Sequence, residues 1–169
     1  MAMKANAPVT YLLLCLALAS TAGAADPAAS APPMADWRDA PMTAGGWHWQ
    51  REGLLSVARY GNAAGGVHFS LTCDRADHAI ILRRSIGNNP SLPEPITITT
   101  TDMQRMIDSN TDRLSSGQGQ GLSARLDADD PLLDAMAFSR GRFMVETPGS
   151  ATLYLPSWAE VSRVIEDCR

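Results

Sequence analysis

The sequence predicts a mostly β domain: an antiparallel β-sandwich or open barrel with one short internal helix, a C-terminal helix and one disulfide. Three observations lead to this prediction. Short segments in which apolar and polar residues alternate recur between Gly, Pro and Asn breaks, which is typical of sandwiches and barrels. Two segments in the last third of the chain carry helix-start signals instead. Two cysteines remain once an N-terminal leader is removed.

That leader comprises residues 1–24, which have the three parts of a secretory signal peptide. Lys4 supplies the charge, an apolar run from Tyr11 to Ala19 follows, and small residues lead to Ala24, after which we expect cleavage. The run is shorter than the ~20 residues of a membrane-spanning helix. We therefore expect a periplasmic or secreted mature chain without a transmembrane helix. Cys15 follows Leu14 rather than a small residue, so we expect it to leave with the leader and not to carry a lipid.

After the leader, residues 25–36 are rich in Ala, Pro and Ser and lack apolar periodicity, which predicts a flexible linker. Residues 37–169 are then expected to form a single β-rich domain, since their number suits one hydrophobic core. The chain has a formal net charge of −4 and no basic stretch. Nucleic acid and anionic membrane surfaces are therefore not expected partners.

The strands follow from period-two alternation and from turn residues at their ends. Pro148-Gly149-Ser150 is expected to join the last two strands as a hairpin, and exposed loops are expected after Ile86 and after Leu114. The segment from Thr101 to Asp108 fits either a short helix capped by Thr101 or a continuation of the sheet. The expected strands are residues 47–50, 54–60, 66–73, 78–83, 95–100, 122–126, 142–147 and 152–155.

The internal helix is predicted from Asp130-Pro131, an N-cap followed by a proline at the first helical position. An apolar stripe follows, and Gly141 lies where we expect the helix to stop. The stripe consists of Leu132, Leu133, Met136 and Ala137.

The C-terminal helix is predicted to begin at Ser157, because Ser157 and Glu160 have the spacing of a capping box. Trp158, Val161 and Ile165 would then share the buried face.

Cys73 and Cys168 are predicted to form a disulfide, because an oxidising compartment favours the bond and only one pairing exists. The chain-entropy model gives about 4–5 kcal/mol for closing a loop of this length. The alternative is a redox-active or metal-binding pair. The two cysteines are far apart in the sequence and form no Cys-x-x-Cys motif, which favours the structural bridge.

Catalytic signatures are few. Ser139 lacks the Gly-x-Ser-x-Gly pattern of a nucleophile elbow, although a site combining it with His68 or His78 is the enzymatic alternative. The stretch from Cys73 to His78 lacks zinc-ligand spacing, and the stretch from Asp127 lacks the glycine and glutamate of a calcium loop. We therefore predict no catalytic residue, cofactor or metal, and interpret these aspartates as turn and capping residues.

Four arginines and two tryptophans remain as candidate contact residues. The arginines could converge on a carboxylate or phosphate of a partner, or they could pair with acids on a solvated surface. Trp47 and Trp49 alternate on one face, where they could line a ligand groove or pack into the core. The four arginines are Arg83, Arg84, Arg140 and Arg142.

From Leu122 onward the predicted elements follow in a distinctive order: strand, Pro-Leu-Leu-Asp-Ala-Met helix, Arg-Phe-Met-Val strand, hairpin, Leu-Tyr-Leu-Pro strand and terminal helix. This order resembles the C-terminal half of the invasion-associated locus B family of exported bacterial proteins. The chain departs from that family in lacking its additional cysteines and in having Trp158-Ala159 in place of Gly-Phe. The resemblance implies a periplasmic or surface β-sandwich that contacts the envelope or a host.

These observations together predict an exported, non-enzymatic small domain that binds a protein or a cell-envelope component. The alternative is a small periplasmic hydrolase with a site near Ser139 and His68 or His78. A hydrolase requires a nucleophile and a histidine within hydrogen-bond distance, whereas a binding module requires an uncovered apolar or arginine-rimmed surface.

Overall fold

A computed structural model describes residues 36–64, 66–87, 94–113 and 120–169. The predicted signal peptide, the linker except Asp36, and most of the two predicted loops after Ile86 and Leu114 lie outside the described residues. Asp36 accepts a hydrogen bond from the backbone N–H of Arg38 and caps a short 3₁₀ helix, η1 (Trp37–Asp39).

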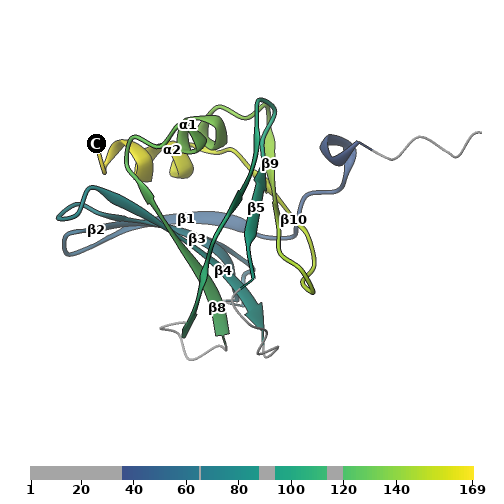
Figure 1. Ribbon diagram of the computed structural model, residues 1–169, viewed down its shortest axis with the longest axis horizontal. Coiled ribbons are helices and arrows are strands. Elements are labelled where there is room, and N and C mark those ends of the chain that lie inside the picture. The colour runs from purple at the N-terminus through teal and green to yellow at the C-terminus, as the bar shows by residue number, and fades with distance from the viewer. Residues whose placement is uncertain (1–35, 65, 88–93, 114–119) are drawn as a thin grey trace, which may run out of the picture. The chain divides into compact units, whose positions relative to one another are not determined.

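The described strands form two antiparallel sheets, which confirms the predicted fold class. Within the described residues, no strand of one sheet pairs with a strand of the other, so no closed barrel forms there. In Figure 1, β5 and β9 run steeply across the direction of β1 and β2. The larger sheet has the order β1 (Gly46–Glu52), β2 (Leu55–Gly61), β3 (Val67–Asp74), β4 (Ala79–Gly87), β8 (Gln120–Asp127) and β7 (Asn110–Arg113). The smaller has the order β10 (Leu153–Pro156), β9 (Arg142–Glu146), β5 (Ile96–Thr99) and β6 (Gln104–Ile107).

One row of aromatic side chains illustrates how register builds the core. Trp47 pairs with Tyr60, and Tyr60 pairs with Phe69, so the three rings lie side by side on the inner face of the larger sheet. Trp47 packs edge-to-face on Tyr60 with ring centroids 5.3 Å apart, and Phe69 packs on Phe143 of the smaller sheet at 6.3 Å. Each fully buried side chain of this kind contributes about 1.5–3 kcal/mol.

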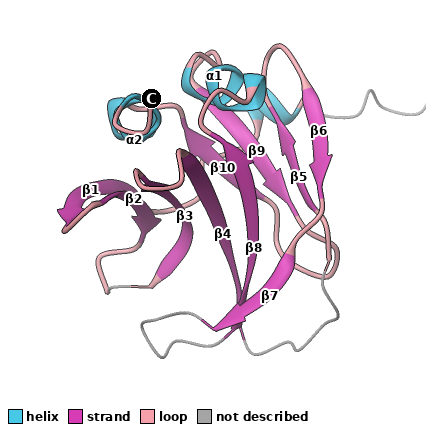
Figure 2. Ribbon diagram, turned by 60° about the vertical axis from the view of Figure 1, so that its left-hand side comes forward, coloured by secondary structure: helices cyan, strands magenta, loops and turns pink. Residues whose placement is uncertain are grey.

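Two helices lie at one end of the molecule (Figure 1): α1 (Pro131–Ala137) and α2 (Ala159–Glu166). The N-cap of α1 is confirmed, because the Asp130 carboxylate accepts a hydrogen bond from the Leu132 N–H at 2.9 Å. α2 packs on α1 and on β1, β2 and β3 (Figure 2), and it buries Val161, Val164 and Ile165.

The predicted capping box at Ser157 is wrong. α2 begins at Ala159, and its N-cap residue, Trp158, makes no side-chain cap. The Ser157 N–H donates to the carbonyl of Gly141 at 3.3 Å, so Ser157 belongs to the connection from β10. This later start also corrects the predicted orientation of Trp158, whose side chain is 49% exposed instead of facing the core.

The end of α1 differs from the prediction, and the structure of the segment from Thr101 to Asp108, which the sequence left open, is decided. α1 ends before Phe138, so Gly141 does not stop the helix; with φ +80° it makes the turn into β9 instead. The segment from Thr101 to Asp108 continues the sheet as β6. Thr100 accounts for this, because its hydroxyl accepts hydrogen bonds from two backbone N–H groups in the tight turn before β6.

Candidate functional site

The edge of the larger sheet is formed by β1, which is joined to β2 by a two-residue turn at Gly53 and Leu54. Gly53 has φ +61°, as a type II′ turn requires at its first central position. This turn fixes the pairing of β1 with β2 and leaves the other side of β1 at the outside of the sheet (Figure 2).

A surface groove of about 390 Å³ lies between this edge strand and the first turns of α2. It is lined by neighbouring residues of β1 on one side and by one face of α2 on the other. The groove is therefore bounded by backbone and side chains of the edge strand and by a helix held firmly over the sheet. The lining residues are Trp47, His48, Trp49, Ala159, Glu160 and Arg163.

Trp49 from β1 and Arg163 from α2 contact each other in the lining of the groove. The guanidinium carbon of Arg163 lies 3.4 Å from the centroid of the Trp49 ring, which is a cation–π contact between α2 and β1. Arg163 is exposed and Trp49 is half-buried, so both remain accessible from solvent. The guanidinium covers one face of the Trp49 ring and is held in place by it, so the pair presents a positioned positive charge that suits recognition of an acidic group.

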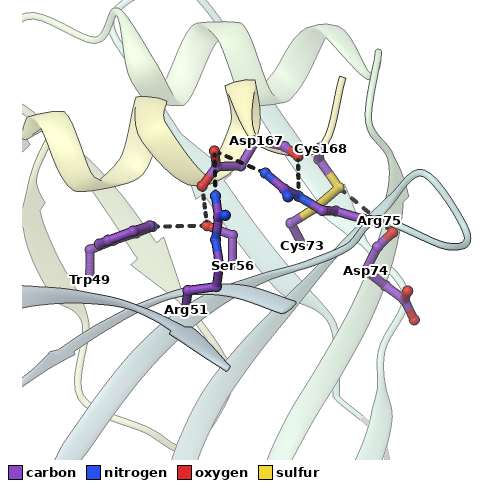
Figure 3. A network of polar contacts seen from close by, with 8 residues as sticks. All are labelled: Trp49, Arg51, Ser56, Cys73, Asp74, Arg75, Asp167 and Cys168. Atoms are coloured by element: carbon purple, nitrogen blue, oxygen red, sulfur yellow. Dashed lines mark hydrogen bonds and ion pairs between the residues drawn. A yellow bond between two sulfur atoms is a disulfide. The ribbon is translucent and has the colours of Figure 1, made fainter. Parts of the chain in front are cut away.

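Both tryptophans of β1 also anchor α2, at opposite ends. The indole N–H of Trp47 donates to the carbonyl of Pro156 at 2.8 Å, just before α2 begins. The indole N–H of Trp49 donates to the Ser56 hydroxyl at 2.8 Å, and that hydroxyl donates to Asp167 at 2.5 Å, just after α2 ends (Figure 3). Of the two alternatives left open for the tryptophans, core packing applies to Trp47, which is buried, and groove lining applies to Trp49, which forms part of the groove wall.

Asp167 collects several partners where α2 meets the sheet (Figure 3). One carboxylate oxygen accepts from Ser56, which is fully buried, and the other lies 3.3 Å from the guanidinium of Arg75 and 3.8 Å from that of Arg51. The Nε of Arg75 also donates to the backbone carbonyl of Asp167 at 2.9 Å. Three neighbouring strands or turns of the larger sheet therefore hold the C-terminal end of α2.

The predicted disulfide between Cys73 and Cys168 is confirmed and lies beside this network (Figure 3). The two Cα atoms are 5.4 Å apart, and both residues are buried. The bridge joins β3 to the residue that follows Asp167, so it holds α2 over the sheet together with the polar contacts. His78 Nδ1 donates to the carbonyl of Cys168 at 3.2 Å, which occupies one nitrogen of that ring.

The predicted arginine contacts do not gather at one place. Arg83 faces outward and pairs with Asp112 at 2.9 Å, whereas Arg84, the next residue along β4, faces inward. Arg140 is exposed in the turn after α1, and Arg142 donates to the backbone carbonyl of Ala40. Their separate partners explain their positions, and a role in partner contact stays a prediction.

Arg84 is the one charged side chain among the buried residues of the described chain, with 4% of its surface exposed. It donates to the carbonyls of His68 at 3.3 Å, Ser85 at 3.0 Å and Ala151 at 2.6 Å, and so joins β3 and β4 to the β9–β10 hairpin. Burial lowers the pKa of Arg84 to about 10, so the side chain is still charged at neutral pH.

Ser139 is buried beside β9, where its hydroxyl donates to the carbonyl of Arg142 and accepts from the N–H of Thr101 at 3.1 Å. His68 lies at the start of β3, and His78 lies in the turn beyond its other end. In the described residues, no group of three or more His, Cys, Asp or Glu side chains is arranged to hold a metal ion. Asp77 lies in the turn between β3 and β4, as predicted, and Asp74, the last residue of β3, accepts hydrogen bonds from the N–H groups of Ala76 and Asp77 in that turn.

Ser56, Asp167 and Arg163 are site residues that were not predicted from the sequence. Ser56 and Asp167 are 111 positions apart, and neither lies in a recognisable motif. The one available signal for Arg163 was its place on the polar side of α2, which many exposed arginines share.

No family model and no curated protein matches the chain. Among solved structures, the chain has a weak resemblance to the crystal structure of invasion associated protein B from Bartonella henselae. The two share 13% sequence identity with a TM-score of 0.44, and the match covers 72% of this chain and 95% of the other. At this level, the likeness assigns neither a fold nor a function to the chain.

Proposed function

We propose that this chain is an exported, non-enzymatic binding domain whose groove between β1 and α2 contacts a protein or a cell-envelope component. The observation that supports this most is the open groove beside a sheet edge, lined by the Trp49–Arg163 pair among others. Tryptophan and arginine are enriched among the residues that dominate binding energy at interfaces.

The disulfide supports export, because such bonds form and persist in oxidising compartments. Within the described residues, no helix has the length and apolar character needed to cross a membrane. Export itself is tested by N-terminal sequencing of the protein recovered from the periplasm or medium, where we expect the mature chain to begin after Ala24. An uncleaved protein in the cytoplasm would contradict the proposal.

The contacts of Ser139 favour a binding role over hydrolysis. Its hydroxyl donates its proton to a backbone carbonyl, where a nucleophile would need to donate to a base. We expect the mature protein to hydrolyse p-nitrophenyl acetate no faster than the Ser139→Ala variant. A difference between the two would support the hydrolase alternative.

Site-specific photocrosslinking in intact cells tests the binding role. We would introduce p-benzoylphenylalanine at His48, which is exposed and lines the groove, and at Arg125, which is exposed on β8. A reproducible adduct is expected from the position of His48 and not from that of Arg125. Equal adducts at the two positions, or none at the position of His48, would contradict binding at the groove.

A further inference from the structure

We propose that the partner enters the groove as an extended peptide segment that adds to β1 as a further strand of the larger sheet, with an acidic side chain facing Arg163. The inference rests on the proposed function and specifies the chemistry of its partner. The main chain of the segment would pair with the edge of β1, and the acidic side chain would pair with the cation on α2.

Three residues of β1 direct backbone groups toward the open side of the sheet. Glu52 and Leu55 flank the two-residue turn. In a hairpin with such a turn, the pair of residues next to the turn exchanges hydrogen bonds. Bonded and non-bonded pairs then alternate, so the N–H and C=O groups of Trp47, Trp49 and Arg51 point away from β2. Within the described chain, no backbone hydrogen bond joins any of these three to a loop or another element.

β1 also differs from the other described sheet edges. The edge of β10 is covered by Thr43, whose N–H donates to the Tyr154 carbonyl at 3.0 Å and whose hydroxyl accepts from the Tyr154 N–H at 2.9 Å. β6 and β7 are only four residues long, whereas β1 has seven and contains no proline. Covering an edge and shortening it are two common ways to prevent strand addition, and β1 has neither.

The position of the groove suits a strand more than a compact ligand. Its wall includes Trp47, His48 and Trp49, three successive residues whose side chains alternate between the two faces of the sheet. A groove in contact with both faces of a strand lies along its edge, which is where a neighbouring strand would lie, about 4.8 Å away. α2 forms the opposite wall, so side chains of the added strand that point to the inner face would meet α2.

The positive charge of Arg163 favours an acidic side chain at the position of the added strand that faces it. Arg163 forms no ion pair with a carboxylate in the residues that the structure describes, whereas Arg51 lies 3.8 Å from Asp167. Stacking on Trp49 keeps the cation over the groove. Glu160 lines the groove one turn earlier and repels a second acid at that end. The acidic side chain of the partner is therefore expected opposite Trp49.

The test uses the full mature chain and a phage-displayed library of random linear peptides. A selected peptide is added to isotope-labelled protein, and backbone amide exchange is followed by NMR. In the free protein, the amides of His48 and Gln50 should exchange slowly and those of Trp49 and Arg51 rapidly. With peptide at about ten times its Kd, exchange at Trp49 and Arg51 should slow about tenfold.

Two matched pairs of variants test the two contacts. Arg51→Pro removes an outward N–H without breaking the β1–β2 pairing, and Arg51→Ala removes the same side chain but keeps the N–H. We expect Arg51→Pro to bind the peptide about fivefold more weakly than Arg51→Ala, the loss of one hydrogen bond. Arg163→Gln should weaken binding about threefold while Arg163→Lys restores most of it. Arg125→Gln, the same charge change away from β1, should have no effect.

The outcomes separate this inference from the proposed function. Peptides that bind but slow exchange elsewhere, or equal binding by the two Arg51 variants, would refute strand addition and leave a binding role intact. If the amides of Trp49 and Arg51 exchange slowly without peptide, and more slowly as the protein concentration rises, β1 pairs with a second copy. This result would overturn the inference. Failure to select any peptide would also refute it. The crosslinking comparison at His48 would still decide the proposed function.

Discussion

Asp167 carries the most testable energetic prediction, because it joins α2 to the larger sheet through one buried and two exposed partners. The Asp167→Ala variant loses the hydrogen bond from Ser56, which at 2.5 Å involves an ionised acceptor and is worth about 1.5–3 kcal/mol. It also loses ion pairs with Arg75 and Arg51, whose side chains are 38% and 51% exposed. Such exposed pairs contribute about 0.2–1 kcal/mol each. We therefore expect a total loss of about 2–5 kcal/mol in the free energy of unfolding.

The assay is urea unfolding of the oxidised protein, so that the disulfide is intact in every variant. A double-mutant cycle with Ser56→Ala isolates the buried hydrogen bond, and we expect a coupling energy of about 1–2 kcal/mol. Asp167→Asn serves as the isosteric control, since its amide oxygen still accepts from Ser56. It should lose the exposed ion pairs and the added strength that the charge gives the Ser56 bond, and so cost less than Asp167→Ala. Additive effects of Asp167→Ala and Ser56→Ala, or a loss below about 1 kcal/mol, would refute the reasoning.

Three further predictions concern stability. Replacing Cys73 and Cys168 by Ser should cost about 4–5 kcal/mol in urea unfolding, because the bridge spans 95 positions, and a loss near zero would contradict that reasoning. Arg84→Met should lower the free energy of unfolding by about 1–3 kcal/mol, since three carbonyls lose a charged donor; a more stable variant would show that desolvation outweighs those bonds. The hydrogen bond from Arg59 lowers the pKa of Glu52 below 4.5, so its stabilisation is present above that pH and is lost as pH falls through the folded-state pKa. Glu52→Gln should therefore cost about 0.5 kcal/mol at pH 7, and thermal unfolding at successively lower pH should show this cost decreasing.

Local signals in the sequence predicted the elements that local chemistry decides. The N-cap at Asp130 and the hairpin at Gly149 depend on residues within a few positions, and the structure has both. The start of α2 was mispredicted because a distant group takes part. The Ser157 N–H is bound by the carbonyl of Gly141, a contact that no capping pattern contains.

The candidate site was only partly predictable for the same reason. Alternation placed Trp47 and Trp49 on one face, but the position of α2 decides which indole is buried. The link from Ser56 to Asp167 spans 111 positions and needs the folded sheet to form. The separation of Arg83 and Arg84 was available from alternation along β4, since adjacent strand residues point to opposite faces.

The anchoring of α2 by both tryptophans of β1 has a consequence for how the domain acquires its groove. Contacts between Trp47 and Pro156, and between Ser56 and Asp167, join chain segments more than a hundred positions apart. Such distant contacts are costly in loop-closure entropy, so we expect them to form late in folding. A chain with its sheets formed and α2 undocked has an edge strand but no groove. Competence to bind would therefore appear together with the last tertiary contacts, and it would report on the completeness of folding.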